Sequence, residues 1–588
     1  MPTEKVINRD FNEIFKASVR YEIPFFQRGY AWEQRQWKKL FEDLQNEIIE
    51  NVENNKFSEQ EHFFGPIVVL EKKFDHPAIK KFLVIDGQQR ITTSYLLLGV
   101  IKGLLEDKAH LSTDAQQYVS ELEKLLVNDV STHDDYLKLK VFSTKGDRLP
   151  TYKSIFKANP NTTLLTEDQL LYDPTTNKVD EFVKFATKKL SKHEVPSLYQ
   201  HYQAIIKSLK IVWIPLDEEK DDAQAIFESL NDAGMPLTAS ELLCNYIFRP
   251  LSNDGTNQHE KLHNEKWLEA RKKVGENNFE EYLRTLFSIG EKKRVGKERR
   301  MYVHYKIKNK NLTSEVAKST LNDILGYTTS YNHIISPIQK AHPDAVVKDL
   351  LIKIFNTNMS SINPFLLSLL KANENGSLTI DEVRAILQET YVLLVRRKIT
   401  KLSVTKYDTF FPSLLKYIIN EPNKILAFQK KVQEEQLWVS DQEFTNALLE
   451  KEIYNQRELN FSRLVLQEID KRMQPFGELP DYTTIHTIEH VLPQTLNAHW
   501  KDYLGSDAQE INLPTITNTL GNLSLNGTVA NSTFGQKPFE EKKLLYTDSS
   551  ALAKHIKGIE GNWNIEAIKN RSKNLSEHAL KVWQWTLQ

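Results

Sequence analysis

The sequence contains a single cysteine, Cys244, among 588 residues. One cysteine excludes an intramolecular disulfide and any zinc site built from several cysteines, and it suits a reducing cytoplasm. The N-terminus has no apolar core of the kind found in secretion signals. No apolar run approaches the roughly 18 residues that a membrane helix needs. We therefore expect a cytoplasmic protein without a membrane partner.

Glycine is also scarce, with 20 residues, and neither sign of charge is in excess, with 77 Lys and Arg against 78 Asp and Glu. Few glycines favour helices over glycine-rich hairpins. A balanced total charge does not exclude nucleic acid as a partner, because local patches matter more than the sum. The pattern Gly-x-x-x-x-Gly-Lys-Ser/Thr is absent, which excludes a P-loop NTPase.

The pattern of residues changes twice along the chain, which is long enough for more than one domain. Residues 1–250 mix strand and helix patterns, and residues 251–465 are almost wholly helical in pattern. Residues 466–588 place Pro, Gly, Thr and Asn between short β-branched runs. These changes predict three domains in a helix-rich α+β chain, with a helical connector in the middle.

Short apolar runs and capping boxes locate several elements of this chain. A Thr followed three residues later by Glu predicts helix starts at Thr238 and Thr379. Apolar runs bounded by polar residues predict strands at residues 63–70, 81–85 and 210–215.

The densest polar motif is Asp86-Gly87-Gln88-Gln89-Arg90. It lies between the apolar run 82–85, read as a buried strand, and the apolar helical stretch 95–105. Amide N–H groups at a helix start lack intrahelical acceptors and favour an anion. Two Gln, an Asp and an Arg are poor material for a core. We therefore expect a phosphate or nucleotide site at this strand-to-helix junction.

A second motif, residues 23–32, alternates aromatic residues with Gln and Arg around a glycine. Its Phe and Trp residues are expected to hold a loop against the core. Gln27 and Arg28 are harder to explain by packing, since the planar guanidinium of Arg suits phosphate. Our hypothesis is that this loop and the Asp86–Arg90 motif form one polar pocket.

The C-terminal motif is Ile-His-Thr-Ile-Glu-His-Val-Leu-Pro, residues 485–493. His-x-x-Glu-His on a helix would be the inverzincin zinc pattern, and a plain structural histidine is another reading. The run is rich in β-branched residues, and Pro493 would end a helix soon after His490, so we favour a strand. His486 and His499 are interpreted as structural or surface positions.

A second strand is expected at residues 520–525, followed by a helical part. Two strands and a helix suit a ββα-metal (HNH) nuclease. Phosphodiester hydrolysis needs a base, for which histidine is suited near neutral pH, and a divalent ion. Oxygen ligands such as Glu and Asn suit Mg²⁺ or Mn²⁺. The lysines expected to steer the DNA backbone are Lys537, Lys542 and Lys543.

Three sets of residues resemble one known family. The strings at residues 23–32 and 86–93 resemble the N-terminal domain of GmrSD-type (type IV, modification-dependent) restriction proteins, which is related to the ParB and sulfiredoxin nucleotide-binding fold. The segment 227–237 is similar to the same domain. Glu-His-Val-Leu-Pro at 489–493, with the later Gly-Asn-Leu and Ala-Asn-Ser strings, is similar to the nuclease half of this family.

The resemblance implies a role for each matching residue. Around a nucleoside triphosphate, GTP or ATP, it places Asp86, Gly87, Gln88, Gln89 and Arg90, with Gln27 and Arg28 nearby. In the nuclease half it implies His490 as general base and Asn522 as the residue that holds the loop. It implies Asn531 and Glu489 as metal ligands. Glu489 is the weakest match, because adjacent residues of a strand point to opposite faces.

The resulting expectation is a DNA endonuclease or nickase of bacterial anti-phage defence. Nucleotide binding or hydrolysis would gate it, and its DNA partner would carry modified bases or backbone. The alternative is a nucleotide-dependent sensor of DNA modification whose C-terminal domain does not cleave. A third reading is a ParB-like domain that positions DNA without hydrolysis. Monomer and homodimer both stay open.

Overall fold

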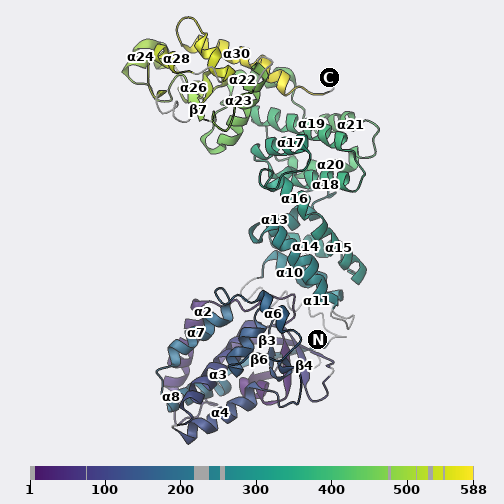
Figure 1. The fold of residues 1–588 in the computed structure, drawn as a ribbon, viewed down its shortest axis with the longest axis vertical. Coiled ribbons are helices and arrows are strands. Elements are labelled where there is room, and N and C mark those ends of the chain that lie inside the picture. Colours follow the sequence, from purple (N-terminus) through teal and green to yellow (C-terminus); the bar gives the residue numbers. More distant parts are fainter. Residues whose placement is uncertain are drawn as a thin grey trace. The chain divides into compact units, whose positions relative to one another are not determined.

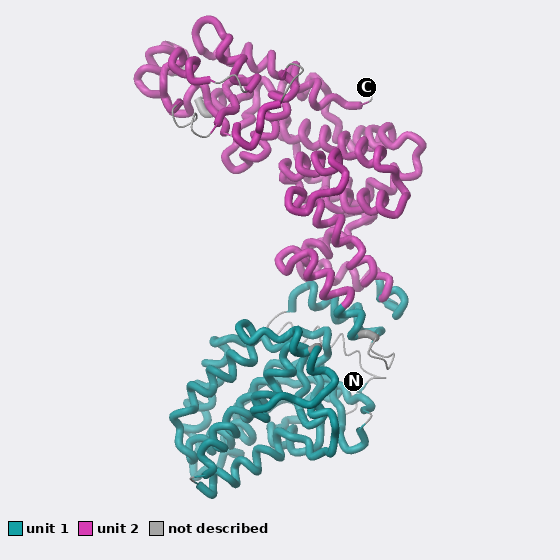
Figure 2. Tube along the Cα trace, in the orientation of Figure 1, with its two compact units in different colours: residues 1–264, 309–317 teal, residues 265–308, 318–588 magenta. Residues whose placement is uncertain are grey.

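The computed structural model describes residues 7–74, 76–110, 112–217, 237–251, 258–474, 479–485, 487–510, 513–527, 534–546 and 550–586. The chain forms two units (Figure 2): residues 1–264 with 309–317, and residues 265–308 with 318–588. The three-domain division stays a prediction, and its boundary at 465/466 falls inside helix α23 (Leu459–Met473). Among the described residues, no helix combines the length and apolar character required to cross a membrane.

The first unit is built on a six-stranded mixed sheet with the order β1-β6-β3-β4-β2-β5. Its strands are β1 (Ile7–Asp10), β2 (Val19–Glu22), β3 (His62–Lys72), β4 (Lys80–Asp86), β5 (Val141–Phe142) and β6 (Leu209–Leu216). β3 pairs in parallel with β6 and antiparallel with β4. These three adjacent strands are the ones that the apolar runs predicted, and the prediction is confirmed.

Strand β3 has apolar residues on both faces. Ile67 and Val69 belong to the main core of the unit, whereas Val68 and Leu70 belong to a smaller apolar cluster with Leu216. This alternation follows from the two-residue period of a strand. Burial on both faces explains why the part of β3 from Ile67 to Leu70 appears in the sequence as a continuous apolar run.

The helix that follows β4 organises the core of the first unit. α3 (Gln88–Lys108) packs against β3 and against α4, α7 and α8, which Figure 1 labels, and it also packs against α5. The helices described in this unit are α1 (Phe11–Lys16), α2 (Gln34–Glu42), α3, α4 (Thr113–Leu126), α5 (Arg148–Phe156), α6 (Leu165–Leu171), α7 (Lys178–Leu190), α8 (Val195–Gln203), α10 (Ala239–Phe248) and α11 (Gln258–Leu262). The predicted capping box of Thr238 and Glu241 is present at α10.

The second unit begins with helices only, as the sequence predicts for the connector. These are α12 (Glu269–Val274), α13 (Glu276–Phe287), α14 (Arg299–Lys308), α15 (Ser314–Gly326), α16 (Thr328–Ile335), α17 (Ala345–Asn356), α18 (Asn363–Glu374), α19 (Ile380–Ile399), α20 (Tyr407–Ile418), α21 (Lys424–Glu434) and α22 (Asp441–Glu450). α15 begins within the part of the chain assigned to the first unit. The predicted capping box of Thr379 and Glu382 opens α19.

The C-terminal part of the second unit contains an antiparallel pair of strands, β7 (Thr487–His490) and β8 (Leu523–Asn526). α23, α29 and α30 pack around this part, with α23 and α29 against β8. The helices here are α24 (Ala498–Leu504), α25 (Asp507–Glu510), α26 (Leu513–Thr517), α28 (Phe539–Leu545), α29 (Ala551–Lys557) and α30 (Ile565–Val582).

The residues after α30 return to helix α19. The guanidinium of Arg396, which is fully buried, donates hydrogen bonds to the carbonyl oxygens of Trp583 at 2.7 Å and Val439 at 3.0 Å. The amide of Thr586 donates to Glu389 Oε1 at 2.9 Å. Trp585 stacks on Trp438 with ring centroids 4.1 Å apart. The connector helix α19 and the segment after α30 are thus joined by polar contacts within this unit.

Candidate functional site

The first candidate site lies where β4 ends and α3 begins, as predicted. Asp86 is the last residue of β4, and Gly87 is the N-cap of α3 with φ of 91°. Glycine adopts this left-handed conformation readily. Gly87 has no side chain with which to cap the helix, so it leaves the first amides of α3 available to an anion.

The aromatic loop and the Asp86–Arg90 motif are in direct contact. Gln89 Oε1 accepts hydrogen bonds from the amides of Ala31 at 2.8 Å and Trp32 at 3.3 Å, and its Nε2 donates to Gly29 O at 3.0 Å. In return, Gln27 Nε2 donates to the carbonyl oxygens of residues 84 and 85, both at 3.1 Å. The side chains of Gln27 and Gln89 therefore hold the aromatic loop against the end of β4 and the start of α3. The sequence does not reveal this role.

The aromatic residues hold this loop as expected. The ring of Phe25 packs edge-on against Phe26, Phe248 and His263, and Trp32 packs edge-on against Phe64. Gln88 is buried within the first turn of α3, and Arg28 is half-buried on the loop.

Arg90 lies across the backbone of β3. Its guanidinium donates to the carbonyl oxygen of Pro66, and its Nη1 lies 3.8 Å from Asp86 Oδ2. Gly65 leaves room for the Arg90 guanidinium, because a Cβ on residue 65 would lie 2.7 Å from Arg90 Nε. The Gly-Pro pair that interrupts the apolar run of β3 is the sequence feature that marks this contact.

Gly87 supports a stability prediction. A Cβ at this position would lie 2.9 Å from the carbonyl oxygen of Pro66 and 2.9 Å from Ile67 Cγ1, in addition to the strain of a positive φ. Gly87→Ala should lower the free energy of unfolding by about 2 kcal/mol, measured by thermal and urea unfolding. Gly146→Ala is the control, since Gly146 has φ of 86° but a looser contact of 3.2 Å. Equal losses in both variants would contradict the close contact at Gly87.

The second candidate site is centred on His490, the last residue of β7. The strand prediction is confirmed, and a helical His-x-x-Glu-His zinc motif is excluded. His490 is half-buried, its ring packs edge-on against Tyr454 at 4.5 Å, and its Nε2 lies 3.1 Å from Asn518 Oδ1. Burial is the main reason that the pKa of His490 falls from 6.5 to about 4. The imidazole is therefore neutral at pH 7.

The contact with Asn518 shows which nitrogen of the His490 ring carries the proton. Its Oδ1 also accepts a hydrogen bond from Gln494 Nε2 at 3.1 Å, so the nitrogen of His490 that faces it must donate. A neutral imidazole protonated on Nε2 carries its lone pair on Nδ1. Among the described residues, Nδ1 of His490 has no hydrogen-bond partner. Asn518 was not anticipated from the sequence, because it precedes the recognisable Gly-Asn-Leu string.

Asn522 is fully buried and joins four parts of the fold. Its Oδ1 accepts from the amide of Leu492 at 2.7 Å and from Trp563 Nε1 at 3.2 Å. Its Nδ2 donates to the carbonyl oxygens of Leu492 and Thr517, both at 2.9 Å. This geometry fixes the chain immediately after His490; the role that the resemblance implies for Asn522 in the nuclease stays a prediction.

Glu489 points to the other face of β7 and pairs with Lys542. The carboxylate lies 2.7 Å from Lys542 Nζ, which also donates to His490 O at 2.9 Å. Burial raises the pKa of Glu489 to about 7 and lowers the pKa of Lys542, because it disfavours both charged forms; their mutual attraction opposes both shifts. The expectation that Lys542 steers DNA is wrong, because this side chain is 0% exposed.

The remaining predicted positions are divided between described and undescribed parts of the chain. Asn531, His486 and most of the segment 227–237 lie outside the described residues. His499 is exposed on α24, as interpreted from the sequence. Lys537 is exposed and lies 3.4 Å from Glu541, whereas half-buried Lys543 donates to Ile559 O at 2.7 Å.

Comparison with known families identifies both halves. Residues 11–248 match the family described as GmrSD restriction endonuclease, N-terminal domain, and residues 438–578 match GmrSD restriction endonucleases, C-terminal domain. A search of curated proteins found no match. The first match contains the Gly87 junction and the aromatic loop, and the second contains His490, Asn518 and Asn522. The chain belongs to the GmrSD restriction endonucleases, a family of enzymes that act on DNA.

Proposed function

We propose that this protein is a modification-dependent DNA endonuclease or nickase of anti-phage defence, with His490 as its general base. The observation that carries the proposal is a neutral imidazole at the end of β7 whose Nε2 is bound by Asn518. A general base must be unprotonated at the working pH and held in one orientation. Burial keeps the His490 ring unprotonated at pH 7 and Asn518 fixes its tautomer, while a pKa of about 4 makes the ring a weaker base than an ordinary histidine.

In the proposed reaction, His490 Nδ1 removes a proton from a water molecule as the water attacks the scissile phosphorus. The new P–O bond forms as the bond to the leaving oxygen breaks, and that oxygen acquires a proton from solvent. Asn522 keeps the chain after His490 in place, and Asn518 stabilises the imidazolium that forms by orienting Nε2–H. General-base catalysis of this kind contributes about 10²–10⁴-fold to a rate.

A divalent ion, Mg²⁺ or Mn²⁺, would neutralise charge on the phosphate and on the leaving oxygen. Asn531 is the ligand that we propose for it, and Mg²⁺ commonly takes only one or two protein ligands together with substrate phosphate oxygens. Glu489 does not fit this role, because Lys542 already occupies its carboxylate. We assign Glu489 to the buried ion pair that supports the end of β7.

For the N-terminal domain, we propose that a nucleoside triphosphate, GTP or ATP, binds at the start of α3. The uncapped amides after Gly87 suit a phosphate, and Arg90 lies beside them. Gln27 Oε1 is buried and accepts no hydrogen bond from the described residues, so it fits a donor on an incoming ligand. Gating of DNA cleavage by this nucleotide is part of the proposal.

A rival function is a nucleotide-dependent sensor whose C-terminal domain does not cleave. One observation favours it: among the described residues, the carboxylate nearest to His490 in sequence is engaged by Lys542, and the group of three side chains whose spacing could suit a metal ion lies elsewhere. The endonuclease cleaves DNA and the sensor does not, so one cleavage assay separates the two functions.

The test is an assay with phage DNAs that differ in base or backbone modification, incubated with Mg²⁺ and with or without each nucleotide. We expect cleavage of a modified DNA and a change in its rate on adding GTP or ATP. Arg90→Ala should remove the nucleotide effect while leaving nucleotide-free cleavage in place. Nucleotide binding without metal-dependent cleavage of any DNA would establish the sensor instead.

A further inference from the structure

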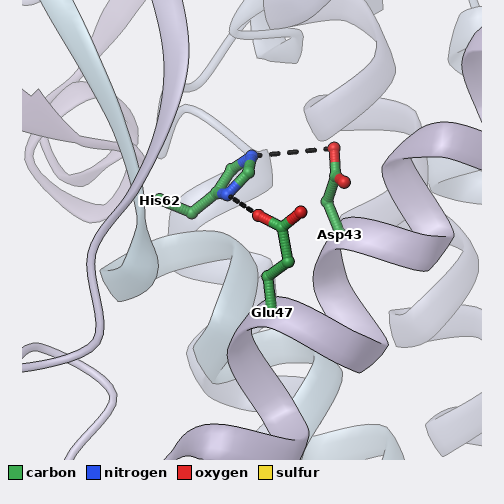
Figure 3. Close-up of side chains that lie close together, drawn as sticks. All are labelled: Asp43, Glu47 and His62. Atoms are coloured by element: carbon green, nitrogen blue, oxygen red, sulfur yellow. Dashed lines mark ion pairs between the residues drawn. The ribbon is translucent and has the colours of Figure 1, made fainter.

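A group of three side chains in the first unit lies apart from both sites described above. Asp43 and Glu47 are four residues apart on η1 (Asp43–Ile48), a π-helical turn that continues α2. His62 is the first residue of β3 and pairs with Leu209 of β6. Figure 3 shows the His62 ring between the two carboxylates. Turns of π-helix are rare and occur often at functional sites.

The distances within this group are short. His62 Nδ1 lies 2.8 Å from Glu47 Oε2, and His62 Nε2 lies 3.6 Å from Asp43 Oδ2. One donor atom from each residue can be chosen so that all lie within 4.8 Å of one another. Ligands around a tetrahedral zinc ion, with bonds of about 2.1 Å, are separated by about 3.4 Å. Because Glu47 faces Nδ1 and Asp43 faces Nε2, binding requires side-chain rotations that turn both carboxylates toward one nitrogen of the His62 ring.

We propose that Asp43, Glu47 and His62 bind a divalent transition-metal ion, with Zn²⁺ as the best match. One imidazole and two carboxylates are borderline ligands of the kind that Zn²⁺ accepts, and three protein ligands leave a fourth position for water. The ion would tie the π-helical turn after α2 to the start of β3. Because His62 stands at the beginning of a strand and the carboxylates on one helical turn, the two elements offer a preformed frame.

Lys39 is the group that competes with the ion. Its Nζ lies 2.5 Å from Asp43 Oδ1 and 3.7 Å from Glu47 Oε1. The lysine side chain is 66% exposed, so it can move into solvent when a metal ion neutralises the carboxylates. Asp43 is buried and cannot move in the same way, which makes it the fixed ligand of the three. A cluster of ion pairs would show the same contacts, so the effect of removing Lys39 on metal binding separates the two interpretations.

The test uses the full chain with His490→Ala as background, so that a metal ion at the nuclease site contributes equally to every sample. Zn²⁺ binding is followed by isothermal titration calorimetry, and Co²⁺ by its visible absorption. We expect His62→Asn to weaken Zn²⁺ binding at this site at least tenfold and to abolish the Co²⁺ absorption. Exposed His133 provides the matched control, and His133→Asn should bind as the background does.

Lys39→Ala is the decisive variant. Removing the competing ammonium should tighten Zn²⁺ binding by about two- to fivefold. Unchanged or weaker binding in Lys39→Ala, or wild-type binding in His62→Asn, would overturn the proposal and leave an ion-pair cluster. If His62→Asn fails to fold, Glu47→Gln replaces it, because the Glu47 side chain is half exposed, and it must show the same loss.

Discussion

Replacing His490 with alanine should lower the rate of metal-dependent DNA cleavage by about 10²–10⁴-fold. The reason is that the Nδ1 lone pair, which faces no hydrogen-bond donor among the described residues, is the base that we assign to the attacking water. The effect is measured as initial rates of plasmid nicking at saturating Mg²⁺. Equal cleavage rates for the variant and the wild type would show that His490 takes no part in the reaction.

His499→Ala is the matched control for this experiment. His499 lies nine positions further along the chain, on α24, and its side chain is exposed. The His499→Ala variant should cleave DNA at the wild-type rate and unfold at the wild-type temperature. A loss of cleavage in both variants would indicate damage to the fold rather than to the chemistry.

The pKa of His490 sets the pH dependence of cleavage. Because the folded-state pKa is about 4, the ring stays unprotonated from pH 8 down to pH 5, and cleavage should fail through this group only as the pH approaches 4. The unfolded chain binds a proton near the ordinary value of 6.5. The ring therefore contributes fully to stability above pH 6.5, and this contribution is lost progressively as the pH falls toward 4.

Replacing Lys542 with methionine should lower the free energy of unfolding by about 3–5 kcal/mol. Glu489 would lose the cation that lowers its pKa, so the buried group would have to take up a proton and would lose its charged partner, and the hydrogen bond to His490 O would be lost as well. Urea unfolding followed by tryptophan fluorescence measures the loss. Lys537→Met is the control, because Lys537 is exposed and should change stability by less than about 0.5 kcal/mol.

A double variant resolves the role of Glu489. Glu489→Gln with Lys542→Met removes both buried charges, and such replacements are often close to neutral for stability. We expect the double variant to regain most of the stability and to retain cleavage. A folded double variant without cleavage would restore Glu489 as a metal ligand, because only that role requires its charge.

The strands beside the motifs could be predicted because they are strongly apolar. The sequence does not predict three other strands, β1, β2 and β5. β1 and β2 have four residues each and mix polar with apolar residues, and β5 has only two residues. β1 becomes a strand by pairing with β6, about 200 residues away in the chain. No local pattern carries that information.

The site was predictable where a motif was dense, and it was not predictable where one side chain acts through a distant contact. The motif at 86–90 indicated a strand-to-helix junction, and the structure has one there. Lys542 looked like other surface lysines, and only the contact with Glu489, 53 residues away, reveals its position. Nucleotide, Mg²⁺ and DNA modification stay predictions, because they concern molecules outside the chain.

The return of the chain to α19 has a practical consequence for recombinant work on the nuclease half. A fragment cut to the family match, residues 438–578, would omit Trp583 and Trp585 together with Arg396 and Glu389. Extending it only to the last residue would keep the stack of Trp585 on Trp438 but would remove the α19 partners, Arg396 for the carbonyl oxygen of Trp583 and Glu389 for the amide of Thr586. An expression boundary ahead of residue 380 retains both halves of this contact, so soluble nuclease fragments should be designed from there.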